Sequence, residues 1–346
     1  MPTEFPTYNA LAPIKTELAA RNETLFDDDS LNSATKEGAT FLSPSPLING
    51  LKEELSPVIL RDRHHRSAEL PAPVAMHDNK GGFYTRCRLK GNGLYSGPRE
   101  DWLYKIRNIK KDATGYVLGL QPEEVFTRSL KHSRMLREMG IETEVPIVAY
   151  GLSEVIYQLR SGVARLTLAD ALKEANLPEE YNDVPFTIKM DAFGINHRLV
   201  DFIHAETLFP EDENNAENVR EIILKEVENY LIQEAKYNEF ELPDFNNLKE
   251  FCRFIIARIM RNLGRLHKNG GIHGMLTPHN LTIDGKFVDY DTLKWLTGEQ
   301  LKEGQTQDLQ KLRESVFEFL TQIFDPIEAE LIIQHGIHEY SHILNL

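Results

Sequence analysis

Residues 281–289 form the stretch that most restricts the fold around it, with the sequence LTIDGKFVD. An Asp-Gly pair between two runs of β-branched and aromatic residues is the strongest short-range signal for a β-hairpin. We therefore predict a two-residue type I′ turn at Asp284 and Gly285, because both central residues of this turn need a positive φ. The register that follows places Asn280 directly opposite Asp289, with Cβ atoms about 4.5–5.5 Å apart on one face.

This predicted pairing brings an amide oxygen and a carboxylate together at the open end of the hairpin. Oxygen ligands, completed by waters and phosphate oxygens, suit Mg²⁺, which rarely receives a complete protein cage. The spacing of Asn280 and Asp289 therefore predicts a metal–nucleotide site. The alternative is that both side chains only cap the hairpin.

The residues before the hairpin favour the metal site. Apolar side chains recur at helical spacing through residues 247–268, and a glycine-containing turn then leads to His273 and Gly274. Kinases and aminoglycoside-phosphotransferase-like enzymes use this order: a catalytic loop with an asparagine and then a metal-binding aspartate. We expect His273 to have a structural role and not to act as a base.

The first half of the chain is predicted to be strands around one helix, and the second half to be mostly helical. Pro122, two glutamates in the first turn and Gly140 delimit the helix at residues 122–140. The expected strands lie at residues 83–93, 103–109, 114–120, 145–152 and 154–160, the last two as a pair. Further helices are expected at residues 216–234, 247–268, 306–324 and 326–343.

These elements predict an α+β protein in three parts. Residues 1–75 lack a clear pattern and are rich in Pro, Ser, Asn and Asp, which predicts an N-terminal arm that is partly disordered. Residues 76–185 would form a small β-rich, nucleotide-binding lobe. Residues 186–346 would form a helical lobe that carries the catalytic loop and the metal site.

Two further segments are candidates for binding phosphate. Lys90 ends an expected strand, and Gly91 and Gly93 would let the backbone approach a phosphate group. Lys189 and Arg198 flank a glycine-containing turn and could contact phosphate oxygens. The alternatives are a surface strand that ends in Lys-Gly and a solvated loop.

Composition restricts the partners. The formal net charge is −14, whereas a nucleic-acid-binding protein normally carries a basic face, so no nucleic-acid partner is expected. No run of residues approaches the ~18 apolar residues of a transmembrane helix, and the N-terminus does not have the pattern of a secretory signal. Two cysteines, Cys87 and Cys252, give no disulfide framework. We therefore expect a cytoplasmic protein without a membrane partner.

Several of the segments described above resemble the SelO (YdiU) family, in a divergent and shortened form. LKGNG (89–93) is similar to the family's LKGAG, and SRMLREMGIETEVPIVAYG (133–151) resembles its helix followed by a Leu-Gly-Ile-Pro-Thr segment. The most specific match is RNLGRLHKNGGIHGMLTPHNLTIDGKFVDYD (261–291), which keeps the order His-Gly, Asn, hairpin, Asp-Tyr. The resemblance runs from about residue 82 to residue 291 in scattered blocks.

The resemblance implies a two-lobed, protein-kinase-like fold that uses ATP and Mg²⁺ (or Mn²⁺) to transfer AMP to a hydroxyl of a protein or peptide. It makes Lys90 the phosphate-contacting lysine and Asn280 and Asp289 the metal ligands. It also places Lys189 and Arg198 near two arginines that grip the nucleotide's phosphates. The spacing between these two residues is longer here, and one arginine is replaced by lysine.

Other departures from the family pattern concern catalysis. The family has an acid immediately before the metal-binding asparagine, and this chain has His279, which could itself accept a hydroxyl proton. Asp291 is a reserve ligand or base, or alternatively a helix N-cap. The helix glutamate that pairs with the lysine has no clear counterpart. A gapless alignment places Ser129 at its position, and Glu123 or Glu124 could substitute only with a gap.

Three functions therefore remain open. The first is ATP-dependent AMP transfer to a protein or peptide hydroxyl, with His279 and Asp291 as candidate catalytic residues. The second is phosphate transfer to a small molecule or peptide. The third is a catalytically impaired, pseudokinase-like binding or regulatory module, which the lack of a carboxylate at Met275 and His279 favours.

Overall fold

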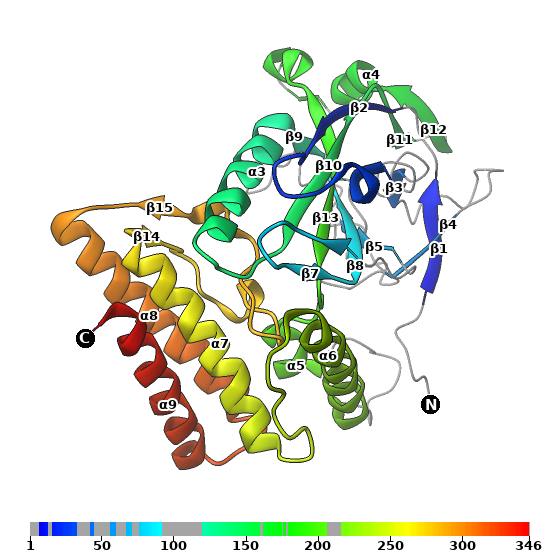
Figure 1. Ribbon diagram of the computed structural model, residues 1–346. Coiled ribbons are helices and arrows are strands. Elements are labelled where there is room, and N and C mark those ends of the chain that lie inside the picture. The colour runs from blue at the N-terminus through cyan, green and yellow to red at the C-terminus, as the bar shows by residue number, and fades with distance from the viewer. Residues whose placement is uncertain are drawn as a thin grey trace. The chain divides into compact units, whose positions relative to one another are not determined.

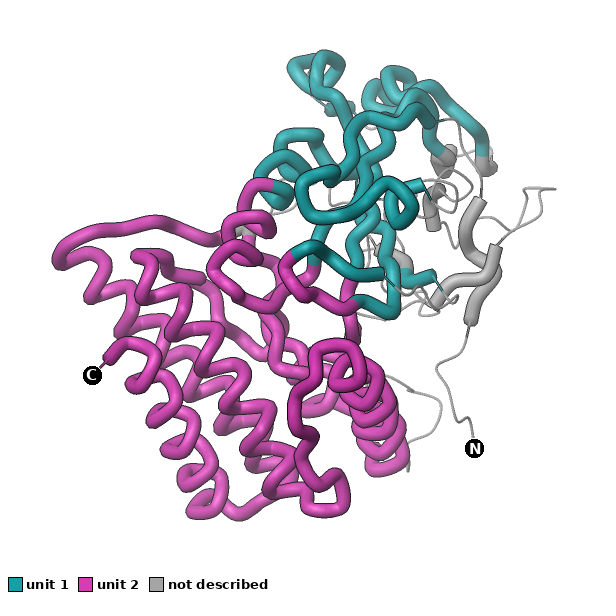
Figure 2. The backbone as a smooth tube through the Cα atoms, viewed as in Figure 1, with its two compact units in different colours: residues 1–79, 84–130, 145–192 teal, residues 80–83, 131–144, 193–346 magenta. Residues whose placement is uncertain are grey.

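The structure is a computed structural model, and the chain has a mixed α+β fold (Figure 1). The structure describes residues 7–12, 16–32, 42–44, 56–59, 67–70, 76–91, 120–159, 162–174, 176–177, 179–205 and 216–345. The chain divides into two compact units, which have different colours in Figure 2. Unit 1 contains residues 1–79, 84–130 and 145–192, and unit 2 contains residues 80–83, 131–144 and 193–346. The three-part division expected from the sequence stays a prediction.

Unit 1 is built on a sheet with the strand order β2-β10-β13-β8-β5-β4-β1-β3, in which β9 also pairs with β13. The strands are β1 (Thr7–Ala12), β2 (Thr16–Arg21), β3 (Leu42–Pro44), β4 (Ser56–Ile59), β5 (Ser67–Glu69), β8 (Arg86–Lys90), β9 (Gln121–Pro122), β10 (Val145–Leu152) and β13 (Phe186–Phe193). β2 and β5 come from the segment that the sequence suggested was an arm. β2 pairs with β10, and β5 pairs with β8.

Alternation along the strands gives the sheet of unit 1 one apolar face. Cys87 and Leu89 of β8 and Ile188 and Met190 of β13 belong to one buried apolar cluster, which Leu25 also joins. Because successive side chains of a strand point to opposite faces, the intervening charged residues of β8 and β13 lie on the other face. Both faces of β13 are buried, so its charged residues Lys189 and Asp191 are buried as well.

The predicted strands at residues 145–152 and 154–160 do not pair with each other. β10 pairs with β13 and β2, whereas β11 (Glu154–Leu159) pairs with β12 (Gly162–Thr167). Only Ser153 separates β10 from β11, and one residue is too short for a hairpin connection, which needs about two. The other small elements are β6 (Met76–His77), β7 (Phe83–Tyr84), α4 (Leu168–Glu174) and the 3₁₀ helix η1 (Glu179–Asp183).

The predicted helix at residues 122–140 is confirmed as α3 (Glu123–Glu138). It begins directly after Pro122. Gly140, two residues beyond its last residue, adopts a left-handed φ of 71°, which is common after the end of a helix. The expected strand at residues 83–93 is β7 and β8, interrupted at Thr85. The strands expected at residues 103–109 and 114–119 lie outside the described residues.

Unit 2 is mostly helical. Its helices are α5 (Leu199–Ile203), α6 (Ala216–Asn238), α7 (Leu248–Lys268), α8 (Gly298–Leu320) and α9 (Pro326–Leu344). α7, α8 and α9 lie side by side in Figure 1. The short strands β14 (Gly271–Ile272) and β15 (Lys294–Trp295) pair, and two 3₁₀ helices, η3 (Pro278–Asn280) and η4 (Tyr290–Thr292), flank the hairpin. Among the described residues, no helix has the length and apolar composition needed to span a membrane.

Glycines allow α7 and α9 to pack closely. A Cβ added at Gly264 of α7 would lie 2.9 Å from the Cβ of Ile343, and one added at Gly336 of α9 would lie 2.8 Å from Ile256. Helices 216–234, 247–268 and 326–343 were predicted within a few residues of their observed bounds. α8 begins earlier than the predicted residue 306, at Gly298.

Candidate nucleotide and metal site

The hairpin at residues 281–289 is present, but its register is not the predicted one. Leu281 bridges Phe287, and the Thr282 amide donates to the Lys286 carbonyl at 3.0 Å, so the loop has three residues. The Gly285 amide donates to the Thr282 carbonyl at 3.0 Å, and Gly285 has a φ of 91°. This arrangement matches the usual three-residue hairpin, in which a left-handed glycine follows a type I turn.

The predicted type I′ turn at Asp284 and Gly285 is therefore wrong. It needs a positive φ at both residues, and Asp284 is not among the positive-φ residues of the described chain. The Val288 amide donates to the Asn280 carbonyl at 3.0 Å, which pairs Asn280 with Val288 and moves Asp289 one residue further along. The direct opposition of Asn280 and Asp289 is corrected accordingly.

Asp289 has an unusual backbone, with φ 52° and ψ 52°. Four non-glycine residues of the described chain have a positive φ. Asn176, Glu239 and Asn345 each follow a helix, where a left-handed residue commonly ends the helix. Asp289 instead precedes η4, so helix termination does not explain it. A non-glycine residue held in this region is a recognised sign of a functional constraint.

Asn280 is fixed by its own loop. Its amide donates to the Thr277 carbonyl at 2.9 Å, and its side-chain nitrogen donates to the Met275 carbonyl at 2.8 Å. The side-chain bond uses the nitrogen, so the amide oxygen is the atom that could serve as a ligand. Asn280 is buried, whereas the Met275 side chain is exposed.

Arg198 connects the two ends of this site. Its Nη1 atom donates to the His279 carbonyl at 2.6 Å and to Asp289 Oδ2 at 3.0 Å. Its side chain is only 5% exposed, and in the described part of the chain its Nε and Nη2 atoms are buried without a hydrogen-bond partner. A buried guanidinium normally has all its donors satisfied, so two unused donors suit an anionic oxygen ligand.

His279 lies in η3 directly before Asn280, as the sequence requires, and its side chain is exposed. Its carbonyl, and not its ring, makes the contact with Arg198. Asp291 lies in η4, but its side chain is outside the described part of the structure. Its interpretation as a reserve ligand or base, or as a cap, therefore stays a prediction.

Asp308 of α8 holds the beginning of the loop that leads from His273 to Asn280. Its carboxylate accepts hydrogen bonds from the amides of His273 at 2.6 Å and Gly274 at 2.8 Å, and His267 Nε2 lies 3.4 Å away. Burial alone would raise the pKa of Asp308, but these hydrogen bonds outweigh it and lower the pKa below 3.8. No local sequence pattern predicts this contact, because it joins residues 35 positions apart.

His273 is fully buried, and its ring lies edge-on against Phe287 at 5.4 Å between ring centroids. Burial lowers the pKa of His273, although Asp308 and the backbone of Val288 partly oppose this effect. A buried, neutral imidazole in the core fits the structural role expected from the sequence.

The remaining candidate residues belong to unit 1. Lys90 is the last residue of β8 and Gly91 follows it directly. Both residues are buried. Gly91 has a φ of 90°, and a Cβ there would lie 2.7 Å from the Thr187 carbonyl, so this position requires glycine. Gly93 lies outside the described residues.

Lys189 of β13 forms a buried polar group with residues of unit 1. Its Nζ atom lies 3.3 Å from Asp191 Oδ1 and donates to Ser129 Oγ at 3.4 Å. Ser129 is the residue that a gapless alignment places at the position of the helix glutamate, and it lies on α3. Glu123 and Glu124 lie in the first turn of the same helix. Ser129 thus contacts Lys189, whereas the resemblance implies that the residue at this position pairs with Lys90.

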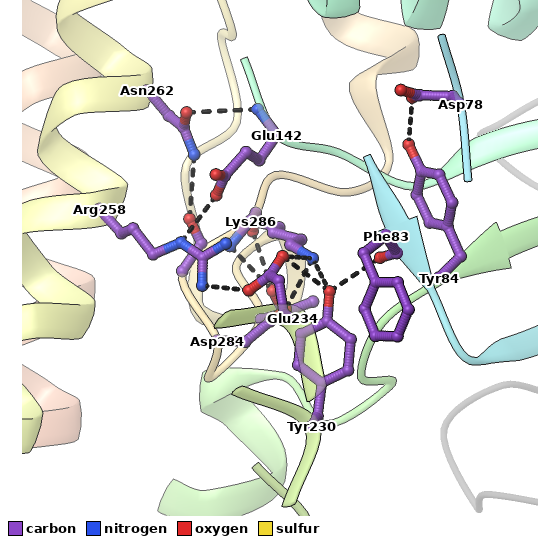
Figure 3. Close-up of polar contacts among 12 residues, drawn as sticks. Asp78, Phe83, Tyr84, Glu142, Tyr230, Glu234, Arg258, Asn262, Asp284 and Lys286 are labelled. Carbon is purple, nitrogen blue, oxygen red and sulfur yellow. Dashed lines mark hydrogen bonds and ion pairs between the residues drawn. The ribbon is translucent and has the colours of Figure 1, made fainter. Parts of the chain in front are cut away.

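A buried ionic network in unit 2 was not predicted from the sequence (Figure 3). Glu234 of α6 lies 2.8 Å from Arg258 Nη1 and 2.9 Å from Lys286 Nζ. Arg258 of α7 also pairs with Glu142 at 2.8 Å, and Lys286 lies 3.2 Å from Asp284. We call Glu142, Glu234, Arg258, Asp284, Lys286 and Tyr230 the hairpin network, because it surrounds the hairpin turn.

The charges of the hairpin network stabilise one another. Burial alone would raise the pKa of Glu234, but Arg258 and Lys286 outweigh it and lower the pKa to about 2. Burial likewise opposes the charged form of Arg258, yet Glu142 and Glu234 raise its pKa well above its ordinary value. Burial raises the pKa of Tyr230 well above 10, so this residue stays a neutral phenol.

The described residues contain no group of three or more His, Cys, Asp or Glu side chains that could form a complete metal cage. One amide oxygen and one carboxylate would instead leave most positions to water and phosphate, which is how Mg²⁺ is usually bound. The sequence matches no protein-family model, and comparison with curated proteins gives no match.

Proposed function

We propose that this protein binds ATP with Mg²⁺ (or Mn²⁺) at Asn280, Asp289 and Arg198 and transfers AMP to a hydroxyl of a protein or peptide. The observation that carries the proposal is the buried guanidinium of Arg198. It contacts the strained Asp289, and its Nε and Nη2 atoms have no hydrogen-bond partner among the described residues. Arg198 thus contacts both ends of the segment that carries Asn280 and Asp289, which brings the three candidate groups for a polyphosphate and its metal together in unit 2.

Each residue would have a separate task. Asn280 Oδ1 and the Asp289 carboxylate would hold the metal, which when bound neutralises charge on the phosphate oxygens. Arg198 would bind phosphate oxygens with its two unused donors. Lys90 and Lys189, on strands of unit 1, are proposed as additional phosphate contacts within a two-lobed, kinase-like fold.

Transfer of AMP requires the acceptor oxygen to attack the α-phosphorus while the bond to pyrophosphate breaks. The proton of the acceptor hydroxyl must leave at the same stage, and the exposed ring of His279 is the candidate that would accept it. A general base contributes about 10²–10⁴-fold to rate, so positioning and charge neutralisation remain the larger part of the catalysis.

Incubation with ATP labelled at the α-phosphate or the γ-phosphate, followed by mass analysis of acceptor protein, tests this proposal. Transfer of adenylate that Asp289→Ala abolishes supports it. Transfer of phosphate alone would favour the second candidate, a phosphotransferase on a small molecule or peptide. Label that survives Asp289→Ala would exclude the assigned site.

A binding module without catalysis is a further candidate, because no carboxylate stands between His273 and Asn280. Stabilisation by ATP and Mg²⁺ without transfer of either label would favour this pseudokinase-like function.

The buried free thiols of Cys87 and Cys252 support a reducing compartment, and we propose that this compartment is the cytoplasm.

A further inference from the structure

The hairpin of unit 2 has two competing registers. The dipeptide Asp284-Gly285 by itself favours a two-residue type I′ turn, in which Ile283 would face Lys286. The structure instead has a three-residue loop that pairs Thr282 with Lys286. Something outside the hairpin must therefore select the observed register over the one that the local sequence prefers.

The first strand of the hairpin is fixed independently of the turn. The Leu199 amide donates to the Leu281 carbonyl at 2.9 Å, and the Ile283 amide donates to the His197 carbonyl at 2.9 Å. A change of register would therefore move the second strand, which begins at Lys286. A slip by one residue turns every side chain of that strand to its opposite face.

In the observed register, Lys286 points into the hairpin network (Figure 3). Its Nζ atom lies 2.9 Å from Glu234 Oε1 and 3.2 Å from Asp284 Oδ2, and it donates to the hydroxyl of Tyr230. The ammonium group also lies 4.5 Å from the centre of the Tyr230 ring. A slip would replace Lys286 on this face with the neighbouring Phe287, which is fully buried and packs against His273.

The partners of Lys286 are themselves fixed. Arg258 of α7 holds Glu234 at 2.8 Å, and the Tyr230 hydroxyl lies 2.8 Å from the Phe83 carbonyl. Loss of Lys286 from its place would leave the buried Asp284 carboxylate with neither an ion pair nor a hydrogen bond to any residue that the structure describes. Unpaired buried charge is strongly unfavourable, and the best-supported use of buried polar groups is to fix register.

We propose that the buried ion pair between Lys286 and Glu234 is a register lock, which holds the hairpin in its three-residue form against the two-residue form. The lock sets the place of Asp289, which follows three residues after Lys286. Its effect on metal and nucleotide binding rests on the proposed function, whereas its effect on register does not.

A matched pair of double variants tests the lock. Lys286→Met removes the cation, and a second substitution at Asp284 removes the carboxylate that this would leave unpaired. Asp284→Asn permits the two-residue turn, because asparagine tolerates a positive φ, whereas Asp284→Thr opposes that turn, because a β-branched residue does not. The two double variants have the same charge and differ mainly in whether the slipped register is accessible.

Crystal structures of the two double variants give the register directly. The lock predicts that Asp284→Asn/Lys286→Met has Ile283 opposite position 286, while Asp284→Thr/Lys286→Met keeps Thr282 there. The three-residue loop in both variants would overturn the proposal. If wild-type protein binds Mn-ATP, the asparagine variant should bind it at least tenfold more weakly and the threonine variant within about threefold of wild type. Failure of wild type to bind would contradict the proposed function and leave the crystallographic test intact.

Glu234→Gln gives a second route that requires no crystals of the double variants. It keeps a hydrogen-bond partner for Lys286 but weakens the ion pair. Hydrogen exchange at the Val288 amide, which donates to the Asn280 carbonyl, should become at least tenfold faster, while exchange at the Ile259 amide within α7 stays unchanged. Equal exchange at Val288 in the variant and wild type would contradict the lock.

Discussion

Arg198 Nη1 lies 3.0 Å from Asp289 Oδ2 and 2.6 Å from the carbonyl oxygen of His279. One guanidinium nitrogen thus joins the two ends of the segment that holds Asn280. The same contact orients the side chain so that its other two donors stay unused within the protein.

Substitution of Arg198 by lysine should weaken nucleotide binding although it keeps the charge. A lysine has no planar fork, so it cannot contact His279 and Asp289 and still present two donors to phosphate. We expect the Kd for Mg-ATP to rise by roughly tenfold or more, as isothermal titration would measure. Arg313→Lys, at an exposed ion pair on α8, is the matched control and should bind normally.

Asn280→Ala and Asp289→Asn should each reduce the contribution of the metal to nucleotide binding. Titrations of ATP with Mg²⁺ and with EDTA separate this contribution from direct contacts. We expect wild type to bind ATP more tightly with Mg²⁺, and the variants to lose most of that difference. An unchanged effect of Mg²⁺ in both variants would show that the metal binds elsewhere.

His279→Ala should slow AMP transfer while leaving ATP binding close to that of wild type. His279 accepts the hydrogen bond from Arg198 with its backbone carbonyl, which alanine retains. A base at this position predicts a loss of about 10²–10⁴-fold in kcat and a changed pH–rate profile. An unaltered pH–rate profile would assign the base to another residue.

Asp308→Ala should destabilise unit 2, because it leaves the buried amides of His273 and Gly274 without their acceptor. Unsatisfied buried donors cost about 1–3 kcal/mol each, so we expect a loss of roughly 2–5 kcal/mol in the free energy of unfolding. Urea denaturation measures it. Asp308→Asn, which retains one acceptor oxygen, should lie between alanine and wild type.

Acid should weaken the hairpin network. Arg258 and Lys286 lower the pKa of Glu234 from 4.5 to about 2 in the folded protein, against the opposing effect of burial. A lowered folded-state pKa adds stability above pH 4.5, and this stability is lost as the pH falls from 4.5 towards 2. The amount is on the order of a few kcal/mol. Urea unfolding between pH 2 and 5 should therefore show a smaller dependence on pH in Glu234→Gln than in wild type.

Local sequence signals were enough for some elements. The spacing of apolar residues predicted α6, α7 and α9 within a few residues, and Pro122 with Gly140 predicted α3. The Asp-Gly pair correctly located a hairpin. Each of these signals depends on residues that are close together in the chain.

The features that local sequence patterns did not predict depend on contacts between residues that are far apart in the chain. The hairpin register depends on contacts of Lys286 with Glu234, which is 52 positions away. The pairing of β2 with β10 joins residues more than 100 positions apart, so local patterns could not predict it either. The candidate site residues came from spacing and resemblance and stay predictions, whereas the contacts of Arg198 with His279 and Asp289 could not be predicted from spacing.

The most direct test of the central claim is the binding of Mg-ATP to wild type and to Asp289→Ala, measured by isothermal titration together with thermal unfolding. The proposed site predicts that Mg-ATP binds to wild type and raises its melting temperature, and that Asp289→Ala folds but loses both effects. Equal binding by the two proteins, or no binding by wild type, would contradict it.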